Sequence, residues 1–225
     1  MSTQVTSKRN KIIPLQPTER RKRGEARDLI LDVALEQFST LGFDGMTTRG
    51  LADACGVNHS LITYHFGDKD NLWKCVMEAL FGPFVERLNA RTEGLGNLEP
   101  EIAMKIAIRD FAAFCAERPE LHRIMTLEGR HQTGRLEWLV ENYMQGVFDT
   151  AVTLIQQGQK QGTIKPGNPA RLYHSIVSIV GASFAYVPQY EMLTGEKTDP
   201  SVIIEEIMLL IERIAFVPNH EQKPR

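Results

Sequence analysis

The chain has 225 residues, of which 42% are hydrophobic and 24% are charged, so it can bury a sizeable core and is not a disordered chain. Its three cysteines are odd in number and widely spaced, which argues against a disulfide framework and fits a reducing compartment. The longest apolar run is too short to span a bilayer, and no secretory signal follows the early basic residues. We therefore expect a cytoplasmic protein without a membrane partner.

Positive charge is concentrated at the start of the chain. Residues 1–27 hold eight basic and two acidic residues, a net charge of +6; because the whole chain carries −2, the remainder carries −8. A basic segment ahead of an acidic body suits phosphate binding, although a solubilising or targeting tail has the same composition. Pro14 and Pro17, together with the lack of an apolar repeat, predict that residues 1–23 form a disordered arm.

Apolar residues at helical spacing predict a first helix over residues 24–41. Ile30, Ala34 and Phe38 lie four apart and form one face of this helix. Gly42 is expected to end it, because glycine favours the backbone conformation that closes helices. The helix would contribute one apolar stripe to a small three-helix bundle.

The stretch Thr47–Lys69 reads TTRGLADACGVNHSLITYHFGDK and has the form of two short helices joined by a tight turn. Gly56 stands where a residue with positive φ is needed to end the first helix. Ile62 and Phe66 lie four apart on the buried face of the second helix. The opposite face has hydrogen-bonding and aromatic groups but no carboxylate, which suits an anionic partner such as the DNA major groove. Its residues are His59, Ser60, Thr63, Tyr64 and His65.

This stretch resembles the DNA-binding module of the TetR (tetracycline-repressor-like) family of bacterial transcriptional regulators. The family pattern runs roughly T-T-x-x-[IL]-A-x-x-[AC]-G-V-x-x-x-x-[LI]-Y-x-[HY]-F-x-x-K-x-x-L. The residues that match it in register are Thr47, Thr48, Leu51, Ala52, Cys55, Gly56, Val57, Ile62, His65, Phe66, Lys69 and Leu72. The chain departs from the pattern at Leu61, where a small polar residue is usual, and at Thr63, where tyrosine is usual.

The resemblance implies that the second helix of the pair reads base edges while its surroundings hold phosphates. Thr47, Thr48 and the backbone amides after them would hold phosphates at a helix N-terminus. Arg49, Tyr64 and Lys69 would add further contacts to the DNA backbone. The residues that would face base edges are His59, Ser60, Leu61 and Thr63, and the methyl groups of Leu61 and Thr63 suit the C5-methyl groups of thymine. The predicted DNA-binding residues are Thr47, Thr48, Arg49, Asn58, His59, Ser60, Leu61, Thr63, Tyr64, His65 and Lys69.

Beyond this pair the apolar pattern is helical almost throughout, with no internal repeat and no convincing strand. A long helix from Lys69 is followed by helices predicted over residues 100–117, 121–128, 134–161, 169–187 and 200–214. We therefore predict an all-α fold of about nine helices. The predicted division is a helix-turn-helix domain at 24–70, a ligand-binding and dimerisation domain at 71–217, and a flexible tail at 218–225.

The resemblance also implies a homodimer formed by the last two helices and a site for an unknown small-molecule effector in the helical core. The predicted dimer-interface residues are Ile176, Val180, Phe184, Ile203, Ile207, Leu210 and Ile214. The predicted pocket residues are Phe111, Phe114, Met125, Trp138, Tyr143 and Phe148, and for each of them plain core packing is the other interpretation. His122 and His131 could also line a pocket, but we favour surface or core-edge positions for both.

The sequence contains no GxSxG, HExxH, CxxC or Walker motif, and its histidines do not share metal-ligand spacing with one another or with the cysteines. We therefore predict no enzyme activity, no cofactor and no metal. The predicted function is that of a ligand-released homodimeric transcriptional repressor that binds double-stranded DNA at a palindromic operator. Two alternatives stay open: a constitutive DNA-binding protein without a ligand, and an all-α enzyme that carries a similar helical pair.

Overall fold

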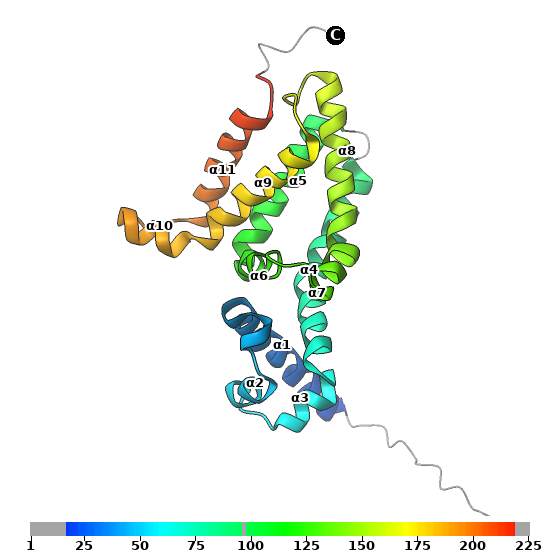
Figure 1. Cartoon of the computed structure of the whole chain (residues 1–225), viewed down its shortest axis with the longest axis vertical. Coiled ribbons are helices and arrows are strands. Elements are labelled where there is room, and N and C mark those ends of the chain that lie inside the picture. Colours follow the sequence, from blue (N-terminus) through cyan, green and yellow to red (C-terminus); the bar gives the residue numbers. More distant parts are fainter. Residues whose placement is uncertain (1–16, 96–97, 219–225) are drawn as a thin grey trace, which may run out of the picture.

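The computed structural model describes residues 17–95 and 98–218, and its regular elements in these ranges are all helices (Figure 1). The all-α prediction is confirmed. Most of the predicted basic arm, residues 1–16, and most of the predicted tail, residues 219–225, lie outside the described residues.

The first helix, α1 (Pro17–Gly45), begins seven residues before the predicted start at residue 24. The prediction treated Pro17 as a sign of disorder. Proline is, however, favoured in the first turn of a helix, and the Glu, Arg and Lys residues that follow it are good helix formers. The end of the regular helix is where the sequence predicts it, because Gly42 has a φ of 71° and a ψ of 176°.

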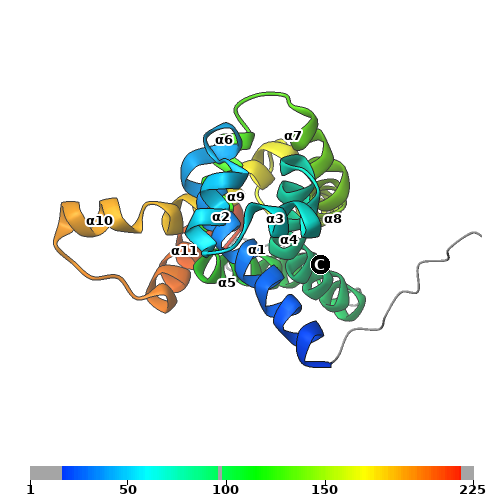
Figure 2. The same ribbon diagram turned by 90° about the horizontal axis from the view of Figure 1, so that it is seen from below.

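Three helices form a small bundle at one end of the molecule (Figures 1 and 2). These are α1, α2 (Thr48–Cys55) and α3 (His59–Phe66), and the long helix α4 (Lys69–Leu95) runs from the bundle into the rest of the chain. The apolar stripes predicted from the sequence meet in its core. The buried residues there are Ile30, Ala34, Phe38, Met46, Leu51, Ala52, Ile62 and Phe66.

The remainder of the chain forms a larger helical body. Its elements are α5 (Pro100–Glu117), α6 (Glu120–Glu128), α7 (Gly134–Leu139), the π-helical segment η1 (Val140–Met144), α8 (Gln145–Gln161), α9 (Pro169–Ala185), α10 (Val187–Thr194) and α11 (Pro200–Ala215). Because α7, η1 and α8 follow one another without a break, they form the single long helix predicted over residues 134–161. The one additional helix is α10. None of its residues is buried, so it has no core-facing apolar stripe that periodicity could reveal.

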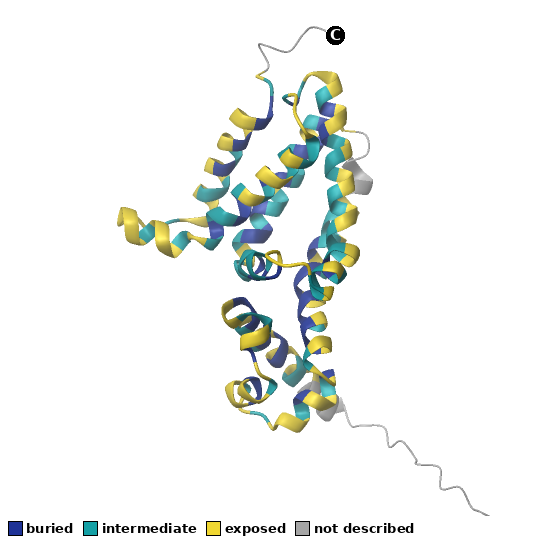
Figure 3. Ribbon diagram, viewed as in Figure 1, coloured by how far each residue is buried: buried dark blue, intermediate teal, exposed yellow. Residues whose placement is uncertain are grey.

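In the larger body, α5 packs against α8, α9 and α11, while α6 packs against both α9 and α1. Helix α6 therefore lies between the body and the small bundle. Helix α10 projects away from both, as Figures 1 and 2 show, and Figure 3 shows that it is largely exposed. At the far end of the body, an isolated antiparallel bridge between Ile164 and Phe216 joins the α8–α9 connection to the end of α11.

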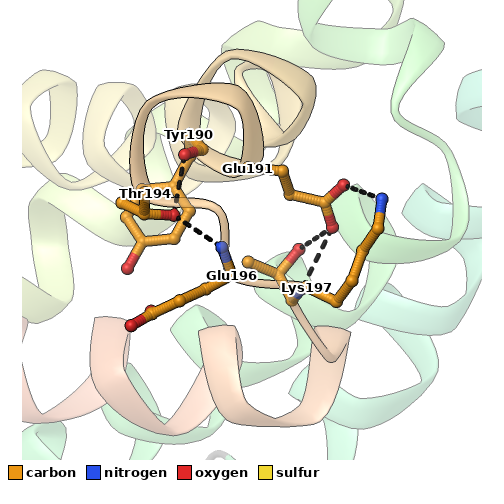
Figure 4. A network of polar contacts seen from close by, with 6 residues as sticks. Tyr190, Glu191, Thr194, Glu196 and Lys197 are labelled. Carbon is orange, nitrogen blue, oxygen red and sulfur yellow. Dashed lines mark hydrogen bonds and ion pairs between the residues drawn. The ribbon is translucent and has the colours of Figure 1, made fainter.

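One carboxylate holds the loop between α10 and α11 (Figure 4). Glu191 pairs with the Lys197 ammonium at 2.8 Å and accepts hydrogen bonds from the backbone N–H of Thr198 at 3.0 Å and from its hydroxyl at 3.1 Å. Thr194 donates its hydroxyl proton to the carbonyl oxygen of Tyr190 at 2.9 Å. The bonds from Lys197 and Thr198 lower the pKa of Glu191 to about 2.

We expect this loop to loosen in acid. A carboxylate whose pKa is lowered in the folded state stabilises that state fully above its ordinary pKa of 4.5, and the contribution disappears as the pH falls through the folded pKa of about 2. The hydrogen-exchange protection factor of the Thr198 amide should therefore be constant at about pH 6 and fall between pH 4.5 and about 2. Glu191→Gln should show the low value already near neutral pH. A pH-independent protection factor in the unmodified chain would contradict this role of Glu191.

Candidate nucleic-acid interface and helical-core cavity

Helix α2 begins with an exposed, capped N-terminus. Thr47 has an extended backbone, and its hydroxyl oxygen accepts a hydrogen bond from the backbone N–H of Gly50 at 3.1 Å. Arg49 follows in the first turn and is exposed. A helix start of this kind presents backbone N–H groups and a partial positive charge, which suit a phosphate group.

The turn between α2 and α3 has the geometry that the sequence predicts. Gly56 adopts the left-handed conformation with φ 64° and ψ 31°, and its N–H and that of Val57 close the end of α2. Asn58 then caps α3: its side-chain oxygen accepts hydrogen bonds from the backbone N–H and the hydroxyl of Ser60, both at 2.9 Å. These caps fix the angle at which α3 leaves the bundle.

The starts of the two helices are joined by a side-chain contact. Nε2 of His59 lies 3.0 Å from the hydroxyl oxygen of Thr48, which stands at the first position of α2. The contact places the capped end of α2 and the outward face of α3 on one surface. At the other end of α3, the side-chain amide of Asn71 donates to the carbonyl oxygen of Phe66 at 2.9 Å and ties α3 to α4.

The predicted DNA-binding residues divide into two groups by exposure. The exposed ones are Thr47, Arg49, Asn58, His59, Ser60, Thr63 and Tyr64, and the half-buried ones are Thr48, Leu61, His65 and Lys69. Leu61 packs against the core of the bundle, because it lies to the side of the buried stripe of α3 and not opposite to it. Lys69 has its ammonium group 4.4 Å from the ring centroid of Phe43. The outward face of α3 is therefore formed mainly by Ser60, Thr63 and Tyr64.

An ion pair in the larger body, between Arg135 and Glu128, lies next to the bundle. Nε of Arg135 on α7 lies 3.2 Å from both carboxylate oxygens of Glu128, which is 6% exposed at the end of α6. The guanidinium of Arg135 also lies 3.8 Å from the ring centroid of Phe43, in the turn that follows Gly42. Phe43 thus contacts cations from two helices, Lys69 on α4 and Arg135 on α7.

We expect Arg135→Ala to lower the free energy of unfolding by about 2 kcal/mol, because it leaves the Glu128 carboxylate buried without this partner. The full cost of breaking a buried pair is not expected, since the Arg135 side chain is 22% exposed. The matched control is Arg109→Ala, which breaks the exposed Arg109–Glu205 pair and should lower the free energy of unfolding much less. Urea denaturation of both variants measures the difference. Equal losses would show that the Arg135 pair has no special structural role.

An apolar cavity of about 270 Å³ lies in the larger body. Helices α4, α5, α6, α8 and α9 and the segment η1 all contribute to its wall. A π-helical turn accommodates one more residue than an α-helical turn, and such turns are frequent at functional sites. Here η1 contributes Tyr143 and Met144 to the lining. Exposed residues on α4 and α8, namely Asn89, Gly146 and Thr150, mark its opening to solvent.

Three of the six predicted pocket residues line this cavity, and three do not. Phe111, Met125 and Tyr143 are part of its wall. Phe114, Trp138 and Phe148 are not part of this wall, and each of these rings packs against another ring. The pairs are Phe114 with Phe84, Trp138 with Trp73 and Phe148 with Tyr173, at centroid distances of 4.4, 5.9 and 5.1 Å.

Other residues also contribute to the cavity wall. His122 lines the cavity, which is the less favoured of the two positions considered for it from the sequence. Leu88, Met104 and Tyr173 also belong to the wall, together with Gly181. Apolar periodicity marks such residues as buried without saying which of them face an empty space, so no signal in one sequence could have separated them from core residues.

The structure places the predicted dimer-interface residues at different depths. Ile176, Val180, Phe184 and Ile207 are buried inside this chain and offer little surface to a second copy. They lie on α9 and α11, which pack against each other and against α5. Ile203 is half-buried. The exposed apolar residues of this region are Tyr190, Met192, Leu193, Val202, Leu209, Leu210 and Ile214.

Within residues 17–95 and 98–218 no three His, Cys, Asp or Glu side chains are arranged to hold a metal ion. No helix in the same ranges is long and apolar enough to cross a membrane.

Two short helices joined by a left-handed glycine turn, with a polar outward face on the second, define a helix-turn-helix DNA-binding protein. Residues 30–74 match the model of the family described as "Bacterial regulatory proteins, tetR family". Residues 30–74 are therefore a DNA-binding module of the kind found in TetR-family transcriptional regulators.

Two curated relatives are similar in sequence to the chain. The HTH-type transcriptional regulator RutR of Escherichia coli K12 is 25% identical over 185 residues, which cover 82% of this chain and 86% of RutR. The HTH-type transcriptional repressor NicS of Pseudomonas putida KT2440 is 29% identical over 106 residues, which cover 47% of this chain and 49% of NicS.

Solved structures share the fold. A bacterial regulatory protein of the tetR family from Rhodococcus RHA1 aligns with a TM-score of 0.67 at 16% identity, over 87% of this chain and 99% of that protein. HlyIIR, a hemolysin II transcriptional regulator, aligns with a TM-score of 0.63 at 23% identity, over 84% and 97% of the two chains. At these identities the likeness concerns the fold alone.

Proposed function

We propose that the protein is a homodimeric transcriptional repressor that binds a palindromic DNA operator and leaves it when a small molecule occupies the helical-core cavity. In this proposal residues 24–70 form the DNA-binding domain, and residues 71–217 form the ligand-binding and dimerisation domain. The observation that carries the proposal is the position of α6, which contributes to the cavity wall and also packs against α1 of the DNA-binding bundle.

The DNA contacts follow from the surface that α2 and α3 share. Ser60, Thr63 and Tyr64 on the outward face of α3 would contact base edges, while the capped start of α2 and Arg49 would hold phosphates. Leu61 and Lys69 would contribute less than the sequence suggested, because both pack against the bundle. RutR and NicS, both named as HTH-type regulators, support DNA as the partner.

The homodimer is supported by the exposed apolar side chains of α10 and α11. Met192 and Leu193 on α10 are 88% and 80% exposed, and Leu209, Leu210 and Ile214 on α11 are also exposed. A group of exposed apolar residues of this kind commonly marks a protein interface. A dimer is also what function requires, because one short recognition helix covers too few base pairs for selective binding, whereas two copies read two half-sites.

The release mechanism requires a ligand that prefers one arrangement of the two DNA-binding bundles. A ligand in the cavity would contact α6 at Leu121 and Met125, one or two turns before Glu128. A shift of α6 would reach the bundle through its packing on α1 and through the Glu128–Arg135–Phe43 contacts. The spacing of the two recognition helices would then no longer match the operator.

The experiment is selection from a random DNA library with the purified full chain at moderate salt. We expect enrichment of a palindrome whose half-site centres lie about one helical turn, or a multiple of it, apart. Failure to enrich any palindrome would overturn the operator proposal. The alternative of constitutive binding predicts that no small molecule changes the affinity of the protein for the selected DNA site. A fluorescence-anisotropy screen of small molecules on that site distinguishes the two.

A further inference from the structure

The cavity wall carries no ionised side chain. Among the described residues that line it there is no Asp, Glu, Lys or Arg. Most of the surface comes from aliphatic, methionine and aromatic residues, including Phe81, Phe84 and Phe111. A charged ligand group inside such a space would lose its hydration without gaining a partner, which is strongly unfavourable. The wall therefore selects against ions and favours apolar and aromatic surfaces.

The imidazole ring of His122 in the wall lies against the backbone of α9 at Gly181. A Cβ at Gly181 on α9 would lie 2.3 Å from Nδ1 of His122 on α6, so only glycine allows the imidazole to occupy this place. Glycine inside a helix is less stable than alanine. The Tyr186 ring lies nearly perpendicular to the imidazole at a centroid distance of 6.3 Å. The side chain of His122 thus lies at the cavity wall against Gly181 on α9 and Tyr186 at the end of α9.

The titratable groups in the wall are in their uncharged forms near neutral pH. Burial lowers the pKa of His122, so its imidazole is neutral and has one donor and one acceptor nitrogen. Burial raises the pKa of the Cys115 thiol to about 12 and also raises the pKa of Tyr173. In the described part of the chain, no hydrogen bond engages the His122 ring, so its nitrogens are available to a ligand.

We propose that the cavity binds an uncharged, predominantly apolar molecule, which is oriented by a hydrogen bond to the imidazole of His122. Its size would be roughly 10 to 15 non-hydrogen atoms, because this number fills about 270 Å³ at the packing density of a protein interior. The aromatic residues of the wall favour a ligand with an aromatic ring. This assignment of ligand class rests on the proposed function of the cavity as the effector site.

The first test compares three naphthalene compounds of nearly equal size by isothermal titration calorimetry with the full chain and without DNA. These are 2-naphthalenemethanol, which is neutral, 2-naphthoate, which is an anion, and 2-naphthylmethylammonium, which is a cation. We expect the alcohol to bind and each ion to bind at least about tenfold more weakly. Binding of either ion as tightly as the alcohol, or no binding of any of the three, would overturn the assigned class.

The second test concerns His122 and uses 2-naphthalenemethanol against 2-ethylnaphthalene, which has the same number of non-hydrogen atoms but no hydroxyl. The unmodified chain should bind the alcohol about fivefold more tightly than the hydrocarbon, because a fivefold ratio of affinities corresponds to one hydrogen bond of about 1 kcal/mol. In His122→Phe this preference should disappear. The control His131→Phe, at an exposed position outside the cavity wall, should keep it. If His122→Phe still binds the alcohol more tightly than the hydrocarbon, His122 does not form the proposed hydrogen bond to the ligand.

Gly181→Ala provides a second variant in case His122→Phe does not fold, because the added methyl group displaces the imidazole and leaves its chemistry intact. It should also abolish the preference for the alcohol, and an unchanged preference would contradict the proposal. DNA release is measured separately, by fluorescence anisotropy of the selected operator. If the alcohol binds but does not release DNA, the ligand class stands and the proposal of ligand-controlled release fails.

Discussion

Leu210→Glu is expected to convert the proposed homodimer into monomers without unfolding the chain, whereas Ile207→Glu is expected to prevent folding. The two residues lie on the same helix, α11, only three positions apart. Leu210 is 47% exposed, so a carboxylate there stays hydrated in the monomer and is desolvated only when a second copy covers it. Ile207 is 4% exposed, and a carboxylate there would be buried without a partner. The cost of about 3 to 5 kcal/mol is comparable to the total stability of a domain.

Light scattering after size-exclusion chromatography measures the assembly, and circular dichroism with thermal melting measures the fold. The control is Leu29→Glu, since Leu29 on α1 is also 47% exposed but lies in the DNA-binding bundle. This variant should remain folded and dimeric. If Leu210→Glu stays dimeric at micromolar concentration, the exposed face of α11 is not the interface. If Ile207→Glu folds with little loss of stability, the packing of α11 against α9 has been assigned incorrectly.

Tyr64→Ala is expected to weaken binding to the selected operator about a hundredfold, or about 2.7 kcal/mol. One base-edge contact contributes about 1–3 kcal/mol, and the substitution acts twice in a dimer. Tyr64 is 66% exposed on the outward face of α3, so its removal should leave the melting temperature unchanged. Fluorescence anisotropy at fixed salt measures the affinity, because phosphate contacts make every affinity depend on salt concentration.

The control for Tyr64→Ala is His131→Ala, which removes an exposed ring from the connection between α6 and α7. Its affinity for the operator should equal that of the unmodified chain. A drop in the melting temperature of Tyr64→Ala would mean that the ring supports the bundle. Unchanged affinity in a folded Tyr64→Ala variant would remove Tyr64 from the recognition surface and leave Ser60 and Thr63 as the base-reading candidates.

The helix-turn-helix could be predicted well because its signals are local. Thr47 and Asn58 cap their helices through bonds to backbone groups two or three residues away, and Gly56 supplies the left-handed turn by its own conformation. Such interactions depend only on neighbours in the chain, so the residue order is enough to place them. The start of α1 at Pro17 has a local signal too, which the prediction assigned to disorder.

The cavity and the dimer face could not be predicted in the same way. Periodicity identified Ile207 and Trp138 as apolar helix positions, but it cannot say whether such a residue meets its own chain, a second copy or an empty space. The π-helical segment adds a further difficulty. One extra residue in a turn rotates all later side chains by about 100° relative to a regular α-helix, so the apolar repeat loses its register after η1.

The sequence by itself determined that the chain is helical, where most helices begin and end, and that a polar recognition helix follows a glycine turn. These properties come from caps, turns and repeats that act over a few residues. Only the tertiary structure decided that His122 lies against Gly181 at a cavity and that Ile176, Val180, Phe184 and Ile207 are internal. The reason is that burial depends on which helix faces are brought together, and those faces come from segments far apart in the chain.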